Sequence, residues 1–180
     1  MIRAFLGIDL PQAVRGALQV QQVLMPLPRK VEAQNLHLTL VFLGECPEPV
    51  LDAAHEGFDA LRERRFTLSL QGLGLFGKAR PHTVWAGVAP SAPLTHLQAK
   101  VETIARRAGC PIDARKFVPH VTLGRLPAMD PADTARLEQA VARGAGFRSE
   151  PWEVSELTLW RSHLTTRGPQ YEVMVRYPLG

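Results

Sequence analysis

Two short stretches of this chain share one pattern and lie about half its length apart. The first reads Asn35-Leu36-His37-Leu38-Thr39-Leu40, and the second reads Val118-Pro119-His120-Val121-Thr122-Leu123. In a β-strand, residues two apart project from the same face. Each stretch is therefore predicted to be a strand that presents its histidine and threonine together on one side. The intervening apolar residues are expected to face a core on the other side: Leu38, Leu40, Val121 and Leu123.

The segments around these motifs alternate between strand-like and helix-like patterns. Apolar runs bounded by turn residues predict strands at residues 3–10, 36–43, 66–75, 82–88, 118–126, 152–160 and 171–177. Apolar residues at helical spacing predict helices at residues 11–25, 50–61, 94–108 and 132–142. The order of the first half recurs in the second, and no low-complexity linker divides the chain. We therefore expect one α+β domain over residues 1–180, with two pseudo-symmetric lobes.

Composition limits the class of protein. Hydrophobic residues make up 46% of the chain, which is enough for a globular core, and the net charge of +4 suits a polyanionic partner without proving one. The apolar runs are too short for a membrane helix, and the N-terminal run ends at Asp9, too early for a signal peptide. We expect a cytoplasmic protein. The two cysteines, Cys46 and Cys110, suggest neither a disulfide framework nor a metal site.

Two histidines that face each other across a groove can act as an acid and a base. The unperturbed imidazole pKa is ~6.5, so both protonation states are accessible near neutral pH. Phosphodiester chemistry needs a base for the attacking oxygen and an acid for the leaving oxygen, and two threonine hydroxyls can donate to the remaining phosphate oxygens. The chain has no metal-binding motif, so we expect neither a metal nor a cofactor.

Less specific interpretations compete with this one. A single His-x-Thr copy could be a half-buried histidine on an ordinary strand, but two copies in matching halves favour function. The stretch from Gly72 to Gly77 has the spacing of a dinucleotide-binding loop, yet a second strand follows where that motif needs a helix. We expect a glycine-rich turn between strands there. The alternative is that Phe76, Lys78 and Arg80 form a loop at the rim of the groove.

The two motifs and their surroundings together resemble a known family. The matching segments are Phe5–Pro11, Asn35–Glu45, Phe117–Arg125 and Tyr171–Val173. They are similar to the two-histidine phosphoesterase superfamily, and in particular to its bacterial RNA 2′,3′-cyclic phosphodiesterases, also called 2′-5′ RNA ligases. The resemblance covers essentially the whole chain. One departure is Gly124, which stands where the family commonly has alanine, and no catalytic residue is missing.

The resemblance implies a fold and a set of roles. Each lobe would be an antiparallel sheet with helices outside, and the active groove would lie between the lobes. The first-motif histidine, His37, would donate a proton to the leaving 3′ oxygen, and His120 would activate water. The other implied roles are phosphate binding by Thr39, Thr122 and Arg125, and contact with the nucleoside by Phe42.

The implied substrate is RNA with a 2′,3′-cyclic phosphate end, such as tRNA fragments, or other nucleotides, and a monomer is expected. Ligation through a 2′-5′ bond would be the reverse reaction, with an RNA 5′-hydroxyl in place of water, and the sequence does not separate the two directions. A module that binds RNA ends without catalysis is the alternative from another class. Two intact His-x-Thr motifs argue against it, because arginine or lysine would serve phosphate binding better.

Overall fold

Ten strands and four α-helices alternate along the computed structural model, which describes residues 1–180. The strands are β1 (Ile2–Asp9), β2 (Arg29–Lys30), β3 (His37–Cys46), β4 (Phe66–Leu68), β5 (Leu70–Phe76), β6 (Thr83–Val88), β7 (His120–Arg125), β8 (Trp152–Val154), β9 (Glu156–Thr165) and β10 (Gly168–Pro178). The helices are α1 (Gln12–Leu24), α2 (Glu48–Asp59), α3 (Ala92–Ala108) and α4 (Pro131–Arg143), with short 3₁₀ turns η1 (Ala33–Asn35) and η2 (Gly144–Gly146). The predicted α+β class is confirmed.

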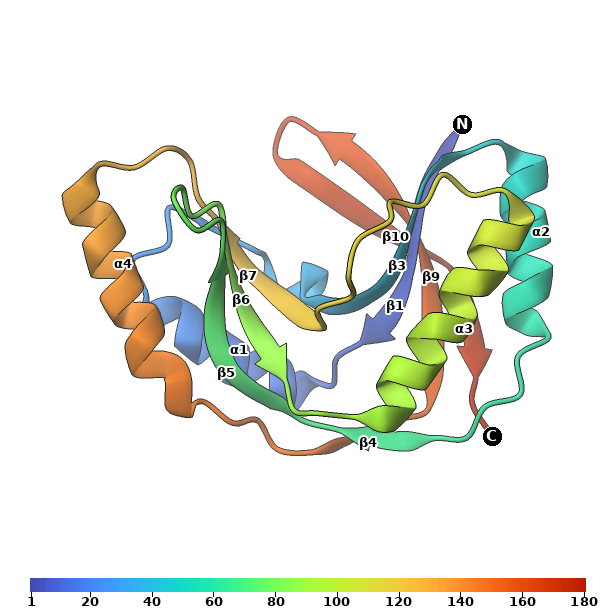
Figure 1. Cartoon of the computed structure of the whole chain (residues 1–180), viewed down its shortest axis with the longest axis horizontal. Helices are drawn as coiled ribbons and strands as arrows, with labels where there is room; N and C mark the ends of the chain where they lie inside the picture. The colour runs from blue at the N-terminus through green and yellow to red at the C-terminus, as the bar shows by residue number, and fades with distance from the viewer.

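The main sheet is antiparallel and has the two motif strands at its centre. Its order is β10-β9-β1-β3-β7-β6-β5, with β2 beside β7. The central strands β3 and β7 pair at one position only, Leu38 with Val121. From that point the two sets of strands diverge, and Figure 1 shows them as two arms of a concave shape. Both motifs therefore lie where the arms meet.

The helices cover the outer sides of the two arms. In Figure 1, α1 and α4 lie outside the arm that contains β5, β6 and β7, and α2 and α3 lie outside the other arm. Helix α1 follows β1 but packs against β7, and α3 follows β6 but packs against β3. Each of these two helices thus follows a strand of one arm in the sequence and packs against the other arm. No helix is long and apolar enough to span a membrane.

The apolar residues of the motif strands form the middle of the core, as predicted. Leu38, Leu40, Val121 and Leu123 are almost completely buried, and they belong to one cluster of 35 buried residues. Their burial on one face forces the alternating histidines and threonines onto the other, concave face.

Two segments that the sequence predicts as single strands are each broken. Residues 66–75 divide into β4 and β5, and residues 152–160 divide into β8 and β9. Strands β4 and β8 leave the main sheet and pair with each other. At the first break, the carbonyl of Ser69 accepts from the amide of Ala89, and the amide of Leu70 donates to the hydroxyl of Ser149. Apolar residues continue across both breaks, so the sequence pattern does not reveal them.

Two glycines allow a direct test of how tightly β1 is packed against β3. A Cβ atom at Gly7 would lie 2.4 Å from the backbone carbonyl oxygen of Leu38, whereas a Cβ at Gly16 in α1 would have no neighbour within 4 Å. We expect Gly7→Ala to lower the free energy of unfolding by about 1–3 kcal/mol, because neither backbone can move freely. Gly16→Ala should raise it by about 0.5–1 kcal/mol. Urea unfolding of both variants measures this, and equal effects would contradict the packing described here.

Candidate active site

The four motif side chains lie together on the concave face of the sheet. His37 and Thr39 come from β3, and His120 and Thr122 come from β7; all four are partly buried. The pairing of Leu38 with Val121 sets each histidine opposite the threonine of the other strand. The two imidazoles lie close enough for the charge of His120 to act on His37.

Both histidines are held in the same way by the backbone. Nδ1 of His37 lies 2.6 Å from the carbonyl oxygen of Asn35, and Nδ1 of His120 lies 2.7 Å from that of Val118. A carbonyl only accepts hydrogen bonds, so Nδ1 carries the proton in each neutral ring. Nε2 is therefore the atom that can take or give a proton, and Nε2 of His37 lies 2.9 Å from the hydroxyl of Thr39. The sequence did not indicate the two carbonyl contacts, because any residue type can supply them.

Aromatic rings enclose the first histidine. The ring centroid of His37 lies 4.7 Å from Phe5, 5.2 Å from Tyr171 and 5.5 Å from Trp160. Trp160 is buried, and it also stacks on Phe5. These rings restrict the orientation of the imidazole and remove water from around it. Sequence reasoning treated Phe5 and Tyr171 only as parts of strands.

The second histidine has a smaller aromatic enclosure. Phe76 meets His120 edge to face at 4.8 Å, and Trp85 lies 6.4 Å away. Both come from the hairpin of β5 and β6, whose glycine-rich strand leaves room for the indole: a Cβ at Gly74 would lie 2.3 Å from the Trp85 ring. The alternative that Phe76 lies at the groove is thus supported. The expected turn over residues 72–77 is wrong, because Gly72 and Gly74 lie within β5 and the hairpin turn begins only after Phe76; no helix follows.

Burial and local charge lower the pKa of both histidines. Burial lowers the pKa of His37 to about 4, against the opposing effects of the Asn35 carbonyl and the carboxylate of Asp9. Burial also lowers the pKa of His120, and the positive charge of Arg125 acts in the same direction. Both rings are therefore neutral at pH 7 in the free protein. The charge of Asp9 favours the protonated form of His37, whereas those of His120 and Arg15 disfavour it. No negative charge offsets the effect of Arg125 on His120.

Each motif strand carries one extra residue directly after its threonine. In the β1–β3 pair, Leu6 faces Val41 and Gly7 faces Thr39, so Leu40 has no partner. In the β6–β7 pair, Val84 faces Gly124 and Trp85 faces Thr122, so Leu123 has none. Such β-bulges turn the following residues over with respect to the sheet.

The bulges bring Phe42 and Arg125 to the histidine face. Strict alternation would place both on the opposite face, yet both are exposed, and the burial pattern of residues 37–42 matches that of residues 120–125 position by position. Phe42 is 61% exposed and lies 5.9 Å from Phe5. The charge of Arg125 acts on both His120 and Tyr171, so its guanidinium lies at the groove between the arms.

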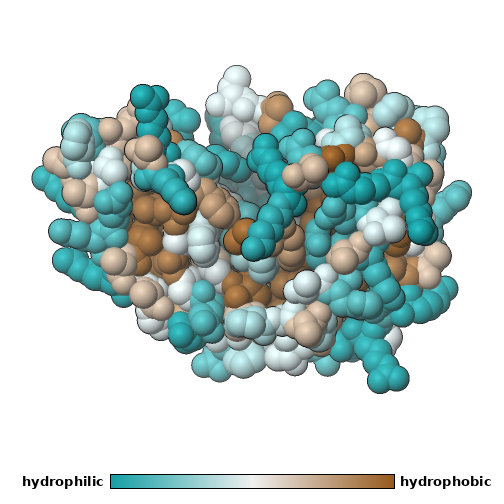
Figure 2. All heavy atoms as spheres, viewed as in Figure 1, coloured by the Kyte–Doolittle hydropathy of each residue, from teal (hydrophilic) through white to brown (hydrophobic).

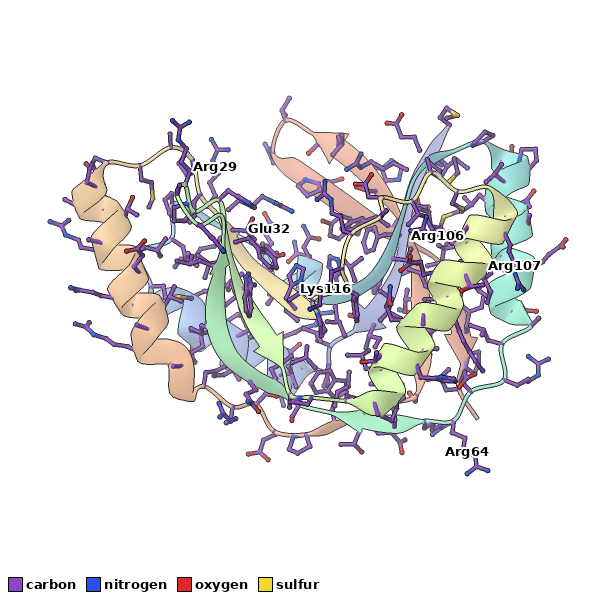
Figure 3. All side chains as sticks on the ribbon, in the orientation of Figure 1. Arg29, Glu32, Arg64, Arg106, Arg107 and Lys116 are labelled. Atoms are coloured by element: carbon purple, nitrogen blue, oxygen red, sulfur yellow. The ribbon has the colours of Figure 1, made fainter.

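Unpaired positive charge surrounds the groove. Arg3, Lys116 and Arg125 take part in none of the ion pairs of the structure. Figure 3 shows Lys116 over the middle of the molecule, between the arms, while Arg106 and Arg107 lie on α3 to one side. Figure 2 shows that this middle region is hollowed and bordered by hydrophilic side chains. A phosphate would find free cations here.

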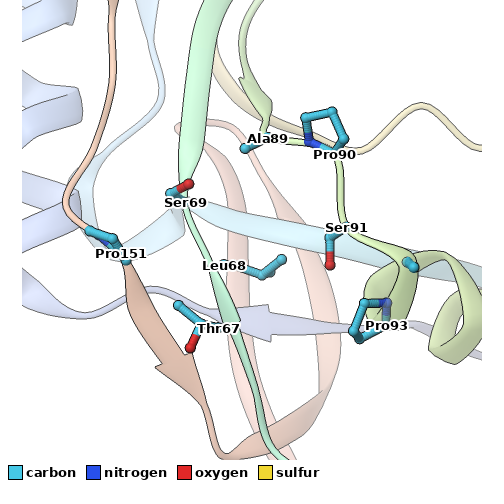
Figure 4. A pocket seen from close by; sticks show the side chains of 9 residues that line it. Thr67, Leu68, Ser69, Ala89, Pro90, Ser91, Pro93 and Pro151 are labelled. Atoms are coloured by element: carbon cyan, nitrogen blue, oxygen red, sulfur yellow. The ribbon is translucent and has the colours of Figure 1, made fainter.

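Two cavities lie away from the histidines. One of about 340 Å³ is lined by Thr67, Leu68, Ser69, Ala89, Pro90, Ser91, Ala92, Pro93 and Pro151 (Figure 4). It has no ionisable side chain. The other, of about 360 Å³, lies between the end of α1 and α4.

The remaining histidines considered from the sequence have local partners. His82 contacts the hydroxyl of Thr83 at 2.8 Å, and His163 contacts the carboxylate of Glu172 at 2.8 Å. No three His, Cys, Asp or Glu side chains come together in a way that could hold a metal ion. The structure therefore brings only His37 and His120 into one groove with free positive charge.

Comparison with known proteins agrees with this arrangement. The family model described as the 2′-5′ RNA ligase superfamily matches residues 11–166. A relative from Aeropyrum pernix, named RNA 2′,3′-cyclic phosphodiesterase, is 34% identical over 148 residues, which cover 81% of this chain and 83% of the relative. One from Escherichia coli K12 with the same name is 32% identical and covers 98% of this chain and 96% of its own length.

Solved structures show the same fold. The crystal structure of Escherichia coli LigT complexed with 3′-AMP is 29% identical, with a TM-score of 0.78 over 99% of this chain and 97% of that one. A crystal structure described as a phosphoesterase is 31% identical, with a TM-score of 0.81 over 99% of this chain and 98% of that one. With this agreement in sequence and fold, the chain belongs to the 2′-5′ RNA ligase superfamily.

Proposed function

We propose that this protein is an RNA 2′,3′-cyclic phosphodiesterase that opens a terminal cyclic phosphate to a 2′-phosphomonoester. The observation that carries the proposal is the pair of equivalent histidines at the centre of the sheet. Both hold Nδ1 against a backbone carbonyl, which leaves Nε2 as the nitrogen that can exchange a proton. The names of the relatives from Aeropyrum pernix and Escherichia coli support the same activity.

In the proposed mechanism the two histidines have opposite roles. Nε2 of His120 takes a proton from water as the water oxygen attacks phosphorus, and Nε2 of His37 gives a proton to the 3′ oxygen as its bond to phosphorus breaks. The products are a 3′-hydroxyl and a 2′-phosphate. Asp9 is the one group whose charge favours a proton on His37, while burial and the charge of Arg125 both disfavour a proton on His120.

The other groove residues would bind the substrate. Thr39 and Thr122 flank the histidines and can donate hydrogen bonds to the non-bridging oxygens, while Arg125 supplies a permanent positive charge. The exposed ring of Phe42 offers an apolar face to the nucleoside. The proposed substrate is RNA with a 2′,3′-cyclic phosphate end, such as a tRNA fragment, or another nucleotide, acted on by a monomer.

The same groups can serve ligation, in which an RNA 5′-hydroxyl replaces water as the attacking group, the bond from phosphorus to the 3′ oxygen breaks and a 2′-5′ bond forms. The name of the superfamily makes this direction a second candidate. The alternative of a binding module without catalysis fits the site less well, because arginine or lysine would serve phosphate binding better than two histidines whose Nδ1 atoms are held by backbone carbonyls. Incubation with two RNA ends, one cyclic phosphate and one 5′-hydroxyl, would show ligation directly as a longer product.

Alanine at either histidine should separate catalysis from binding. We expect His37→Ala and His120→Ala each to lower kcat on a 2′,3′-cyclic nucleotide by about 10²–10⁴-fold, the usual effect of a lost acid or base. Affinity for the 2′-phosphate product should change much less, because Arg125 and the threonines remain. The double variant should be little slower than the slower single one. The rate of the wild-type protein should be unchanged by EDTA. Near-normal turnover of either variant, or full loss with EDTA, would contradict the mechanism.

The pH dependence should be bell-shaped and shifted toward acid. His120 acts as a base only above its lowered pKa, and His37 acts as an acid only where it is protonated, which in the free protein means near or below pH 4. We therefore expect kcat/KM to peak below pH 6.5 and to fall steadily between pH 7 and pH 9. A bound phosphate anion favours protonated His37, so the alkaline limb of kcat should lie at higher pH than that of kcat/KM. A kcat/KM that keeps rising to pH 9 would rule out these roles.

A further inference from the structure

The side chain of Arg15 in α1 binds three separate parts of the chain beside the first histidine. Its Nε donates to the carbonyl of Leu10 at 3.0 Å, and its two terminal nitrogens donate to the carbonyl of Ala33 and the carboxylate of Asp9. The side chain is only 12% exposed. A planar guanidinium with fixed donor directions can join three acceptors in this way, and a lysine cannot.

Two of these acceptors belong to groups that act on His37. Ala33 begins the turn η1, and the last residue of that turn, Asn35, supplies the carbonyl that accepts from Nδ1 of His37. Asp9 lies directly opposite His37 in the β1–β3 register, and its carboxylate favours the protonated ring. Arg15 therefore fixes both the hydrogen-bond acceptor and the negative charge nearest to this histidine.

The second histidine has no equivalent. Its carbonyl partner, Val118, lies in the segment between α3 and β7. Arg106 donates to the carbonyls of Ile112 and Asp113 earlier in that segment, but no arginine side chain bonds to Val118 or the residues next to it. The charged and titratable groups that act on His37 come from four elements: Asp9 of β1, Arg15 of α1, His120 of β7 and Tyr171 of β10. Only one of them, Asp9, is acidic, and Arg15 holds it.

We propose that Arg15 is a positioning residue for His37: by holding η1 and Asp9 in place, it keeps the imidazole in the Nδ1–H form with Nε2 directed at the leaving oxygen. The inference rests on the proposed function, because it assigns a support to the histidine that acts as the acid there. Arg15 does not face the substrate itself, and its effect is transmitted through the Asn35 carbonyl and the Asp9 carboxylate. Each histidine and its surroundings form one half-site. The two half-sites differ, because only His37, which acts as the acid, has this support.

The test compares Arg15→Met with Arg65→Met. Arg65 is a control for loss of such bonds away from the site, because its Nε donates to the carbonyl of Leu179 and its side chain, 52% exposed, pairs with Glu153. We expect Arg15→Met to lower kcat by about 10–100-fold with KM changed less than threefold, because a small displacement of a reacting group is costly. Arg65→Met should leave both constants within twofold. Equal losses in the two variants would overturn the proposal.

A second arm separates positioning from loss of stability. In a His37→Ala background, Arg15→Met should change the residual rate less than twofold, because residues that act through one group are not additive. A further 10-fold loss in that background would show a general structural role and overturn the proposal. If His37→Ala itself keeps near-normal turnover, the proposed function fails. If His37→Ala is inactive and Arg15→Met behaves as wild type, only the positioning role fails.

Imidazole ¹⁵N NMR spectra give a readout besides activity. In the wild type at pH 7, His37 should show the signals of the Nδ1–H tautomer, and Arg15→Met should shift them toward a mixture while His120 stays unchanged. Should Arg15→Met fail to fold, Arg15→Lys decides, since lysine keeps the charge but can reach fewer of the acceptors. An Arg15→Lys variant with wild-type kcat and an unchanged His37 spectrum would overturn the proposal. A changed spectrum with reduced kcat would support it.

The pH profile distinguishes a positioning role from a purely electrostatic one. The charge of Arg15 lowers the pKa of His37, so if charge alone mattered, Arg15→Met would move the alkaline limb to higher pH and increase activity there. The positioning role predicts a lower rate at every pH instead. Asp9→Asn, which removes the opposing charge, should move the alkaline limb to lower pH. A faster Arg15→Met enzyme at pH 8 would contradict the proposal.

Discussion

The pairing of β3 with β7 at Leu38 and Val121 is the contact on which the candidate site depends. These two residues are completely buried, and they fix the register in which two strands from different halves of the chain meet. A shift by one residue would turn the histidines into the core and the leucines into the groove. Because the strands diverge beyond this pair, the concave face stays open at the place where both histidines lie.

The helices keep this junction closed by crossing between the arms. Helix α1 leaves β1 and packs against β7, and α3 leaves β6 and packs against β3. Each arm is therefore covered in part by a helix from the other half of the chain. The apolar contacts that stabilise one arm thus also hold the two arms together. In α1 the same crossing brings Arg15 beside β1 and η1, where it bonds to Asp9 and Ala33.

The two half-sites share a backbone plan and differ in their charges. Both histidines hold Nδ1 against the carbonyl two residues earlier, and both strands place a bulge after the threonine. The position after the bulge is an aromatic residue, Phe42, on one strand and a cation, Arg125, on the other. The repeated backbone therefore carries an apolar side chain in one half and a cation in the other.

The sequence by itself determined the α+β class, most of the strands and helices, the motif histidines and threonines, and the burial of their apolar neighbours. These follow from local periodicity, which depends only on residues near one another in the chain. The broken strands at Ser69 and near Ser155 were missed, because apolar residues continue across them. Phe42 and Arg125 were assigned to the site by family resemblance alone, since alternation points them away from it. Only the tertiary structure decided their face, through bulges set by pairing with β1 and β6, and it alone brought Arg15, Asp9 and the Asn35 carbonyl around His37. Such contacts join segments that are separate in the sequence, so the spacing of residues along the chain does not predict them.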